Sequence, residues 1–187
     1  MADYQLPFSS LLPHPDTPTD SVRRLDAGIE LTADHVLRLR YVLDADLQRV
    51  RVPQPVQGGG RADRLWTHTC FEAFVATDHL SGYLELNFSP SGQWAAYRFD
   101  SYRQGMAAAQ LAAAPELEVA RSQRQLELQA TLRMTLAGSL RVGLSAVVED
   151  DGGRLSYWAL RHPAGRPDFH HPESFSLTLE YSRNPAQ

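Results

Sequence analysis

Lysine is missing from this chain, because all 18 of its basic residues are arginines. Without a lysine amine, the protein has no Schiff-base lysine, no phosphate-loop lysine and no lysine general base. Cys70 is the single cysteine, which excludes an intrachain disulfide and disfavours a cysteine-based zinc site. We expect it to be buried and inert. The formal net charge of −4 gives no electrostatic drive toward nucleic acid, so no nucleic-acid partner is expected.

Long apolar runs are also missing, since no segment approaches the ~18 unbroken apolar residues of a membrane helix. The N-terminus lacks a basic start followed by an apolar run, so the sequence predicts no signal peptide and a cytoplasmic location. With 187 residues, 43% of them apolar, the chain suits one well-buried domain. Four prolines between positions 7 and 18 predict an extended N-terminal arm over residues 1–20, followed by a single domain over residues 21–187.

Short segments with alternating apolar and polar residues recur between turn signals from Val22 onward, which is typical of β-strands. About ten such strands predict an all-β protein, an antiparallel, jelly-roll-like β-sandwich. The Ala-rich segment Tyr102–Ala114, which stops at Pro115, predicts one short helical segment. The predicted strands cover Gly28–Thr32, Val36–Val42, Thr69–Ala76, Tyr83–Ser89, Gln93–Phe99, Leu117–Ala120, Leu126–Met134, Leu140–Glu149, Ser156–Leu160 and Phe175–Tyr181.

Three consecutive strands in the middle of the chain carry the densest set of polar and aromatic residues. Because successive side chains of a strand point to opposite faces, Glu72, Glu85 and Asn87 fall opposite the apolar set. If the strands are neighbours, Trp94 and Arg98 join the same cluster. Such a mixture suits a sugar or another small polar ligand, because aromatic rings stack and the polar groups bind hydroxyls. The alternative is an ordinary solvated sheet face with an Arg–Glu ion pair.

Two other combinations of residues could indicate an enzyme. His68, His162 and His170 could meet as metal ligands, since neutral imidazole is a common ligand. The sequence has no HExxH or comparable close spacing, however, so hydrogen bonds from these histidines to nearby backbone are the expected case. Glu72 and Glu85 could form a glycosidase pair or bind a ligand, and their separation decides between the two.

Several blocks of the sequence resemble one known family. The run Trp66–Val75, followed by Tyr83–Trp94, resembles the bacterial DOMON-like proteins, which are related to the family 9 carbohydrate-binding modules. The later stretches Ser156–Leu160 and Pro167–His170 are similar to the same family, and the resemblance extends from about Leu12 to Leu179. It implies a β-sandwich that binds sugars in some members and haem in others.

The resemblance also implies roles for individual residues. In the carbohydrate-binding modules, two Trp rings clamp a sugar while acidic, amide and Arg side chains bind its hydroxyls. Trp66 and Glu72 match that arrangement, and Trp158 is the candidate for the second ring. Asn87 and Arg98 are the candidates for further polar contacts. The haem-binding branch uses a Met and a His as axial ligands, and no clear Met/His pair stands out in this sequence.

The sequence therefore predicts a noncatalytic domain that binds a carbohydrate or a similar small polar ligand. No cofactor and no membrane partner are expected. The alternatives are a haem-binding domain and a hydrolase that depends on carboxylates or a metal. The candidate ligand-binding residues are Trp66, His68, Glu72, Glu85, Asn87, Trp94, Arg98, Trp158, His162 and His170.

Overall fold

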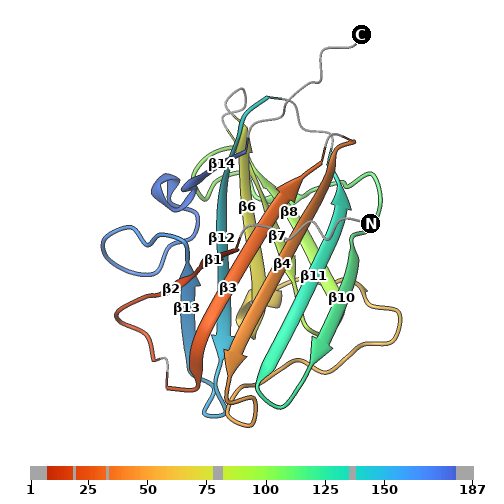
Figure 1. Ribbon diagram of the computed structural model, residues 1–187. Helices are drawn as coiled ribbons and strands as arrows, with labels where there is room; N and C mark the ends of the chain where they lie inside the picture. The colour runs from red at the N-terminus through yellow and green to blue at the C-terminus, as the bar shows by residue number, and fades with distance from the viewer. Residues whose placement is uncertain (1–7, 19, 33, 78–81, 135–137, 180–187) are drawn as a thin grey trace.

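Two sheets packed face to face, antiparallel except for one short parallel pair, contain nearly all the regular structure in the computed structural model (Figure 1). The structure describes residues 8–18, 20–32, 34–77, 82–134 and 138–179. Its strands are β1 (Phe8–Ser10), β2 (Leu12–Pro13), β3 (Val22–Leu31), β4 (Val36–Ala45), β5 (Gly60–Arg61), β6 (Cys70–Thr77), β7 (Tyr83–Phe88), β8 (Gln93–Phe99), β9 (Ala107–Ala108), β10 (Glu116–Arg121), β11 (Gln125–Arg133), β12 (Leu140–Glu149), β13 (Leu155–Ala159) and β14 (Leu177–Leu179).

Helix is confined, in the described part of the chain, to two short 3-10 turns. These are η1 (Leu65–Thr67) and η2 (Pro172–Ser174). No helix among the described residues is long and apolar enough to cross a membrane. The predicted all-β, antiparallel sandwich is confirmed.

The five-stranded sheet has the order β1-β3-β4-β11-β10. Strand β11, and β4 from Leu37 onward, alternate between buried and more exposed residues, as the sequence pattern predicts for a sheet with one buried face. On β4, Leu39 and Tyr41 point inward and are fully buried, while Arg38 and Arg40 point outward. The register places Leu39 opposite Ala130, so the apolar side chains of neighbouring strands meet on the inner face.

The nine-stranded sheet has the order β2-β13-β12-β6-β7-β8-β5, with β14 also paired to β12 and β9 to β8. Its central strand, β6, is buried at nearly every residue rather than at alternate ones. Phe71, Ala73 and Val75 point into the sandwich, as the alternation predicts. Continuous burial means that the outer face of this sheet is covered as well.

The main core fills the space between the two sheets and fixes their relative position. The ring of Tyr41 from the five-stranded sheet stacks on Phe71 of the other sheet, with ring centroids 5.1 Å apart. The Tyr41 hydroxyl donates a hydrogen bond to the backbone oxygen of Glu72 at 2.7 Å. Each large, fully buried side chain stabilises the fold by about 1.5–3 kcal/mol. The backbone of β6 is therefore held rigidly where it carries Glu72.

The predicted helix over Tyr102–Ala114 is wrong. Arg103 and Gly105 both have positive φ values, which breaks a helix at its first turn. Ala107–Ala108 instead forms β9 on β8, and the Ala109 amide donates to the Ala96 carbonyl at 2.9 Å. The intrinsic preference of alanine for helix is small, and pairing with a sheet edge outweighs it in this short segment.

The described part of the N-terminal arm pairs with both sheets. Strand β1 adds to β3 in one sheet, and β2 adds to β13 in the other. His14 follows β2, is buried, and its Nε2 lies 2.9 Å from the carbonyl oxygen of Gly165. The arm therefore connects both sheets to the loop that follows β13.

Candidate functional site

A second cluster of aromatic residues covers the outer face of the nine-stranded sheet. η1, the segment after β8 and the loop after β13 contribute to this cover, and a cavity of about 560 Å³ lies between them and the sheet. From the sheet, the cavity is lined by Glu72, Glu85, Phe99, Val147, Leu155 and Tyr157; from the covering segments, it is lined by Trp66, Thr67, Arg103, Met106, Pro167, Phe169 and His170.

Three polar side chains form a row across the sheet beneath this cover. Ser145 on β12 is paired with Glu72 on β6, and Glu72 is paired with Asn87 on β7. Their exposed fractions are only 2%, 3% and 0%. Ser145 Oγ, Glu72 Oε1 and Asn87 Oδ1 have no hydrogen-bond partner among the described residues. Each buried, unpaired polar atom costs about 1–3 kcal/mol, so the row is poised to bind a polar group.

Glu85 extends the polar row on β7. Asn87, two residues further along β7, is the direct cross-strand partner of Glu72. Glu85 therefore lies diagonally across from Glu72 on the same face. Asn87 Nδ2 donates to Glu85 Oε1 at 2.7 Å. Burial raises the pKa of both carboxyls, and the charge of Glu85 raises that of Glu72 further. Glu72 is thus shifted toward its protonated form, which can both donate and accept a hydrogen bond.

His170 approaches the polar row from the loop after β13. Its Nδ1 lies 2.7 Å from the Tyr83 hydroxyl, and its Nε2 lies 3.7 Å from Glu85 Oε2. Its ring packs edge-on against Phe99, with centroids 5.0 Å apart. Burial, aided by the charge of Arg103, lowers the pKa of His170 to about 4. The imidazole is therefore neutral near pH 7 and does not supply a positive charge to Glu85.

Asp168 ties the two covering segments together. Arg103 Nη2 donates to Asp168 Oδ1 at 2.8 Å, the backbone amide of His170 donates to the same oxygen at 3.1 Å, and the Tyr102 hydroxyl donates to Oδ2. Burial alone would raise the pKa of Asp168, but the hydrogen bonds from Tyr102 and Arg103 outweigh burial and lower it. Asp168 therefore stays ionised and holds Arg103 at the cavity.

Aromatic rings provide the remaining surface of the cavity. Trp66 comes from η1 and meets Tyr97 edge-on, with centroids 5.6 Å apart. Tyr157 projects from β13, and Phe169 packs against it at 6.0 Å between centroids. Burial and the nearby Glu72 raise the pKa of Tyr157, so its hydroxyl stays protonated. The cavity thus combines a polar floor with aromatic surfaces, the usual composition of a site for a small polar ligand.

Half of the residues predicted from sequence belong to this site. Trp66, Glu72, Glu85 and His170 line the cavity, and Asn87 lies beside Glu85 on the same face. The alternative of a solvated sheet face is wrong, because the two carboxyls and the amide are buried beneath the covering segments.

Trp94 and Arg98 lie on the opposite face of the sheet, which corrects their predicted place in the cluster. In the register of β7 and β8, Trp94 is paired with Phe88, and Arg98 with Leu84. Trp94 packs against the main core beneath the guanidinium of Arg61, which lies 5.5 Å from its ring. Both alternating sets on β8 mix aromatic and small residues, so the sequence alone does not distinguish the inward set.

Trp158 is also placed differently from the prediction of a second stacking ring. It is 4% exposed, belongs to the main core, and its Nε1 donates to Ser156 Oγ at 3.0 Å. Since the side chains of β13 alternate, the preceding residue, Tyr157, faces the cavity instead. The prediction therefore named Trp158, whereas the adjacent Tyr157 lines the cavity.

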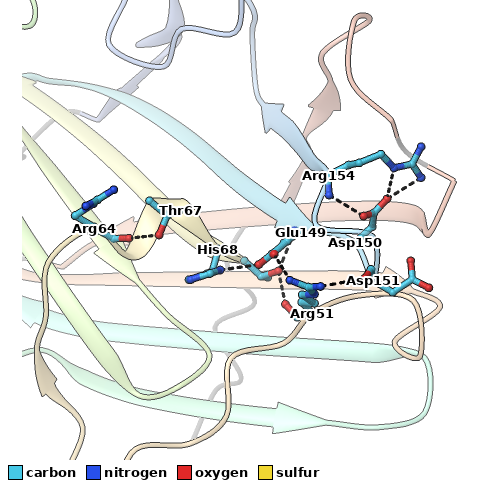
Figure 2. A network of polar contacts seen from close by, with 9 residues as sticks. Arg51, Arg64, Thr67, His68, Glu149, Asp150, Asp151 and Arg154 are labelled. Carbon is cyan, nitrogen blue, oxygen red and sulfur yellow. Dashed lines mark hydrogen bonds and ion pairs between the residues drawn. The ribbon is translucent and has the colours of Figure 1, made fainter.

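His68 and His162 do not approach His170, so the three histidines do not meet at a metal site. Figure 2 shows His68 pointing at Glu149, with its Nδ1 2.7 Å from Oε2, while Arg51 binds the other carboxylate oxygen at 3.0 Å. His162 Nε2 lies 2.8 Å from the Leu12 carbonyl oxygen. Within the described ranges, no three His, Cys, Asp or Glu residues form a group that could hold a metal ion.

The sequence reasoning missed several residues that line the cavity. The alternation of β13 places Tyr157 and Trp158 on opposite faces, but it does not say which of the two faces the main core. Arg103 and Met106 lie in the segment predicted as helix, and Phe169 lies in an irregular loop. Loops carry no periodic signal that predicts where their side chains point.

Comparisons with known proteins identify the class of fold but no family. No protein-family model matches the sequence, and no curated protein matches it either. Among solved structures, the fold is that of the β-sandwiches found in family 9 carbohydrate-binding modules.

Three solved structures represent this likeness. A candidate carbohydrate-binding protein from Bacteroides uniformis is 16% identical with a TM-score of 0.70, covering 94% of this chain and 86% of its own. A family 9 carbohydrate-binding module from Caldicellulosiruptor kristjanssonii in complex with glucose is 9% identical with a TM-score of 0.53, covering 94% and 83%. Such a module from the same organism in complex with cellotriose is 9% identical with a TM-score of 0.52, covering 86% and 75%. These identities establish a shared fold alone.

Proposed function

We propose that this protein is a noncatalytic carbohydrate-binding domain whose ligand occupies the cavity on the outer face of the nine-stranded sheet. The observation that carries the proposal is the unpartnered, buried Oε1 of Glu72, which lines the cavity beneath aromatic surfaces and lies in a row with Ser145 and Asn87. Sugar hydroxyls both donate and accept hydrogen bonds, so they match such a row. Two structures of the same fold contain glucose and cellotriose, which supports this ligand class.

The dimensions and surfaces of the cavity fit a small saccharide. Its volume of about 560 Å³ falls within the ~300–1,000 Å³ typical of small-molecule sites. Trp66 and Tyr157 present aromatic rings on which the apolar face of a pyranose can stack. Glu72 and Asn87 lie on the sheet below, where they can bind hydroxyls. In this proposal Tyr157 takes the role that the sequence resemblance assigned to Trp158.

The finer relationship to bacterial DOMON-like proteins forms part of the same proposal. It rests on the blocks Trp66–Val75 and Tyr83–Trp94, which supply Trp66, Glu72, Glu85 and Asn87 to the site.

Hydrolysis is less well supported than binding. A glycosidase divides the roles of acid and base between two carboxyls whose environments move their pKa values apart. Burial raises the pKa of both Glu72 and Glu85. The solved structures that share this fold are described as carbohydrate-binding, so binding is the better-supported function.

One observation bears on haem. Met106 and His170 line the same cavity, a pairing that the sequence did not reveal. As placed, however, His170 directs Nδ1 to the Tyr83 hydroxyl and faces Glu85 with Nε2. These residues do not fit an axial haem ligand without breaking that contact. Adding haem to the purified protein tests this alternative, and a Soret band that is lost in His170→Ala would support haem binding.

Calorimetric titration of the full chain with glucose, cellobiose and cellotriose tests the carbohydrate proposal. We expect saturable binding that Trp66→Ala and Glu72→Gln weaken. Trp94→Ala is the matched control, because its ring lies on the opposite face of the same sheet. The proposal fails if the native protein binds no saccharide, or if Trp94→Ala weakens binding as much as Trp66→Ala.

A further inference from the structure

Neither buried carboxyl of the cavity forms an ion pair with an arginine among the described residues. Glu72 makes no ion pair with any described residue, and its Oε1 has no hydrogen-bond partner there. Glu85 accepts a hydrogen bond from the neutral amide of Asn87. The nearest ring nitrogen to it, on His170, belongs to an imidazole that burial keeps neutral near pH 7.

Arg103, the cation that lines the cavity, is already engaged elsewhere. Its charge lowers the pKa of Glu85, but its Nη2 donates to Asp168 at 2.8 Å, and that carboxylate balances most of the charge. The chain has no lysine that could reach the cavity instead. If both carboxyls ionise, the groups that line the cavity therefore carry an uncompensated negative charge, which is costly in a buried site.

The surroundings of the pair suit a cation better than an anion. Trp66, Tyr157 and Phe169 line the same cavity, and aromatic faces attract ammonium groups through their quadrupoles. Glu72 and Glu85 are diagonal neighbours across two strands, with Cα atoms about 7–8 Å apart. One ammonium group, with three N–H donors, can bridge carboxyls at that spacing.

We propose that the ligand of this cavity carries an ammonium group that binds between the Glu72 and Glu85 carboxyls. This inference rests on the proposed function, and it narrows the saccharide to an amino sugar. The ammonium group supplies the positive charge that the protein does not, and the aromatic rings contact the rest of the sugar. Asn87 and Ser145 flank Glu72 in the buried polar row of the sheet.

Calorimetry with D-glucosamine, D-glucose and N-acetyl-D-glucosamine tests the proposal. The titrations are run at about pH 6, where amines stay protonated. We expect glucosamine to bind about tenfold or more tightly than the other two sugars, because charge-assisted hydrogen bonds are roughly twice as strong as neutral ones. N-acetylglucosamine is the control for size, since it replaces the ammonium group with a neutral amide.

Proton release provides a second readout, obtained by repeating the titration in buffers of different ionisation enthalpy. Binding of an ammonium group favours the ionised carboxyls, so glucosamine should release protons and glucose should not. The other charged and titratable groups around the pair are Tyr41 on β4, Cys70 on β6, Tyr83 on β7, Tyr97 on β8, Tyr157 on β13, Arg103, Asp168 and His170. The thiol and phenols have raised pKa values, and Asp168 and His170 have lowered ones, so the protons come from the carboxyl pair.

Two variants test whether the Glu72 and Glu85 carboxyls cause the preference for glucosamine. Glu72→Gln keeps the size of the side chain and removes its charge, so the ratio of glucosamine to glucose affinity should fall to about one. Glu85→Gln makes the same test if Glu72→Gln does not fold. Glu149→Gln is the matched control, because Glu149 is a buried carboxylate of the same sheet outside the cavity, and it should keep the ratio of the native protein.

The outcomes separate this inference from the proposed function. If glucose binds as tightly as glucosamine, the ammonium proposal is overturned and carbohydrate binding stands. If ethanolamine raises the melting temperature of the protein and no saccharide binds, the cation site stands and the carbohydrate function falls. If neither sugars nor ethanolamine bind, both proposals are overturned.

Discussion

The outer faces of the two sheets differ in how their polar residues are satisfied. On the five-stranded sheet, outward side chains are solvated and pair with opposite charges, as Arg40 does with Glu127 at 2.6 Å. On the nine-stranded sheet, the polar residues are buried, and Glu72 and Asn87 keep unpartnered atoms. A surface that serves only folding satisfies its own polar groups, whereas a binding surface leaves some of them for a ligand.

The largest expected effect is a loss of stability when the apolar cluster on the outer face of the nine-stranded sheet is disrupted. Phe74 is buried there against Tyr83, Phe169 and His170. We expect Phe74→Ala to reduce the free energy of unfolding by about 3–5 kcal/mol. Val42→Ala, on the outer face of the other sheet, should cost less than about 1 kcal/mol. Urea denaturation measures both, and similar losses would contradict the distinction between the faces.

A smaller effect is expected on binding. Trp66→Ala should weaken saccharide affinity by about 2 kcal/mol, or roughly thirtyfold, because stacking rings dominate the energy of such sites. Trp94→Phe should leave affinity unchanged. Intrinsic fluorescence during titration provides the measurement, and a ligand-dependent signal that disappears with Trp94 rather than Trp66 would place the ligand on the wrong face.

The pH dependence of stability should have opposite signs on the two faces. The pKa of Glu72 is raised in the fold, so folding favours its protonated form. Its contribution is complete below the ordinary carboxyl pKa and is lost as pH rises through the raised value. Relative to the native protein, Glu72→Gln should therefore gain stability toward neutral pH. Urea midpoints measured across the pH range check this, and a gain confined to acid pH would contradict it.

The smallest effect belongs to Glu127. Hydrogen bonds from Arg40 lower its pKa, so its contribution is present above the ordinary carboxyl pKa and is lost as pH falls through the lowered value. Glu127→Gln should cost less than about 1 kcal/mol at neutral pH and nothing in strong acid, because ion pairs near the surface are weak. The same urea series provides the measurement. A larger loss in acid than at neutral pH would show that the ion pair is not its cause.

Much of the fold can be predicted from the sequence, because apolar and polar residues alternate clearly along several strands. Leu140–Glu149 and Gln93–Phe99 are strands with the bounds that alternation predicts. Cys70 is fully buried, and burial raises its thiol pKa, as expected of an inert cysteine. The helix over Tyr102–Ala114 failed because propensity is local, whereas pairing with β8 depends on the rest of the fold.

The site was only partly predictable, for a geometric reason. On β7, every second residue is polar, so the alternation alone assigns Glu85 and Asn87 to the same face of the sheet. On β8 and β13 both alternating sets contain aromatic residues, and the sequence does not say which set faces inward. Trp94 and Trp158 were misplaced for that reason. Arg103 approaches the cavity from a loop, whose path is set by tertiary contacts such as the one with Asp168.

The pairing of distant strands has a consequence for how the protein is made. β4 pairs with β11, and β6 pairs with β12, so both sheets join segments far apart in the sequence. Such topologies fold slowly, because long loops must close before their contacts form. During synthesis, the five-stranded sheet cannot be completed until β11 has emerged from the ribosome, and β6 lacks one of its neighbours until β12 has. His170 follows later still, so the lining of the cavity is complete only after that residue has been made.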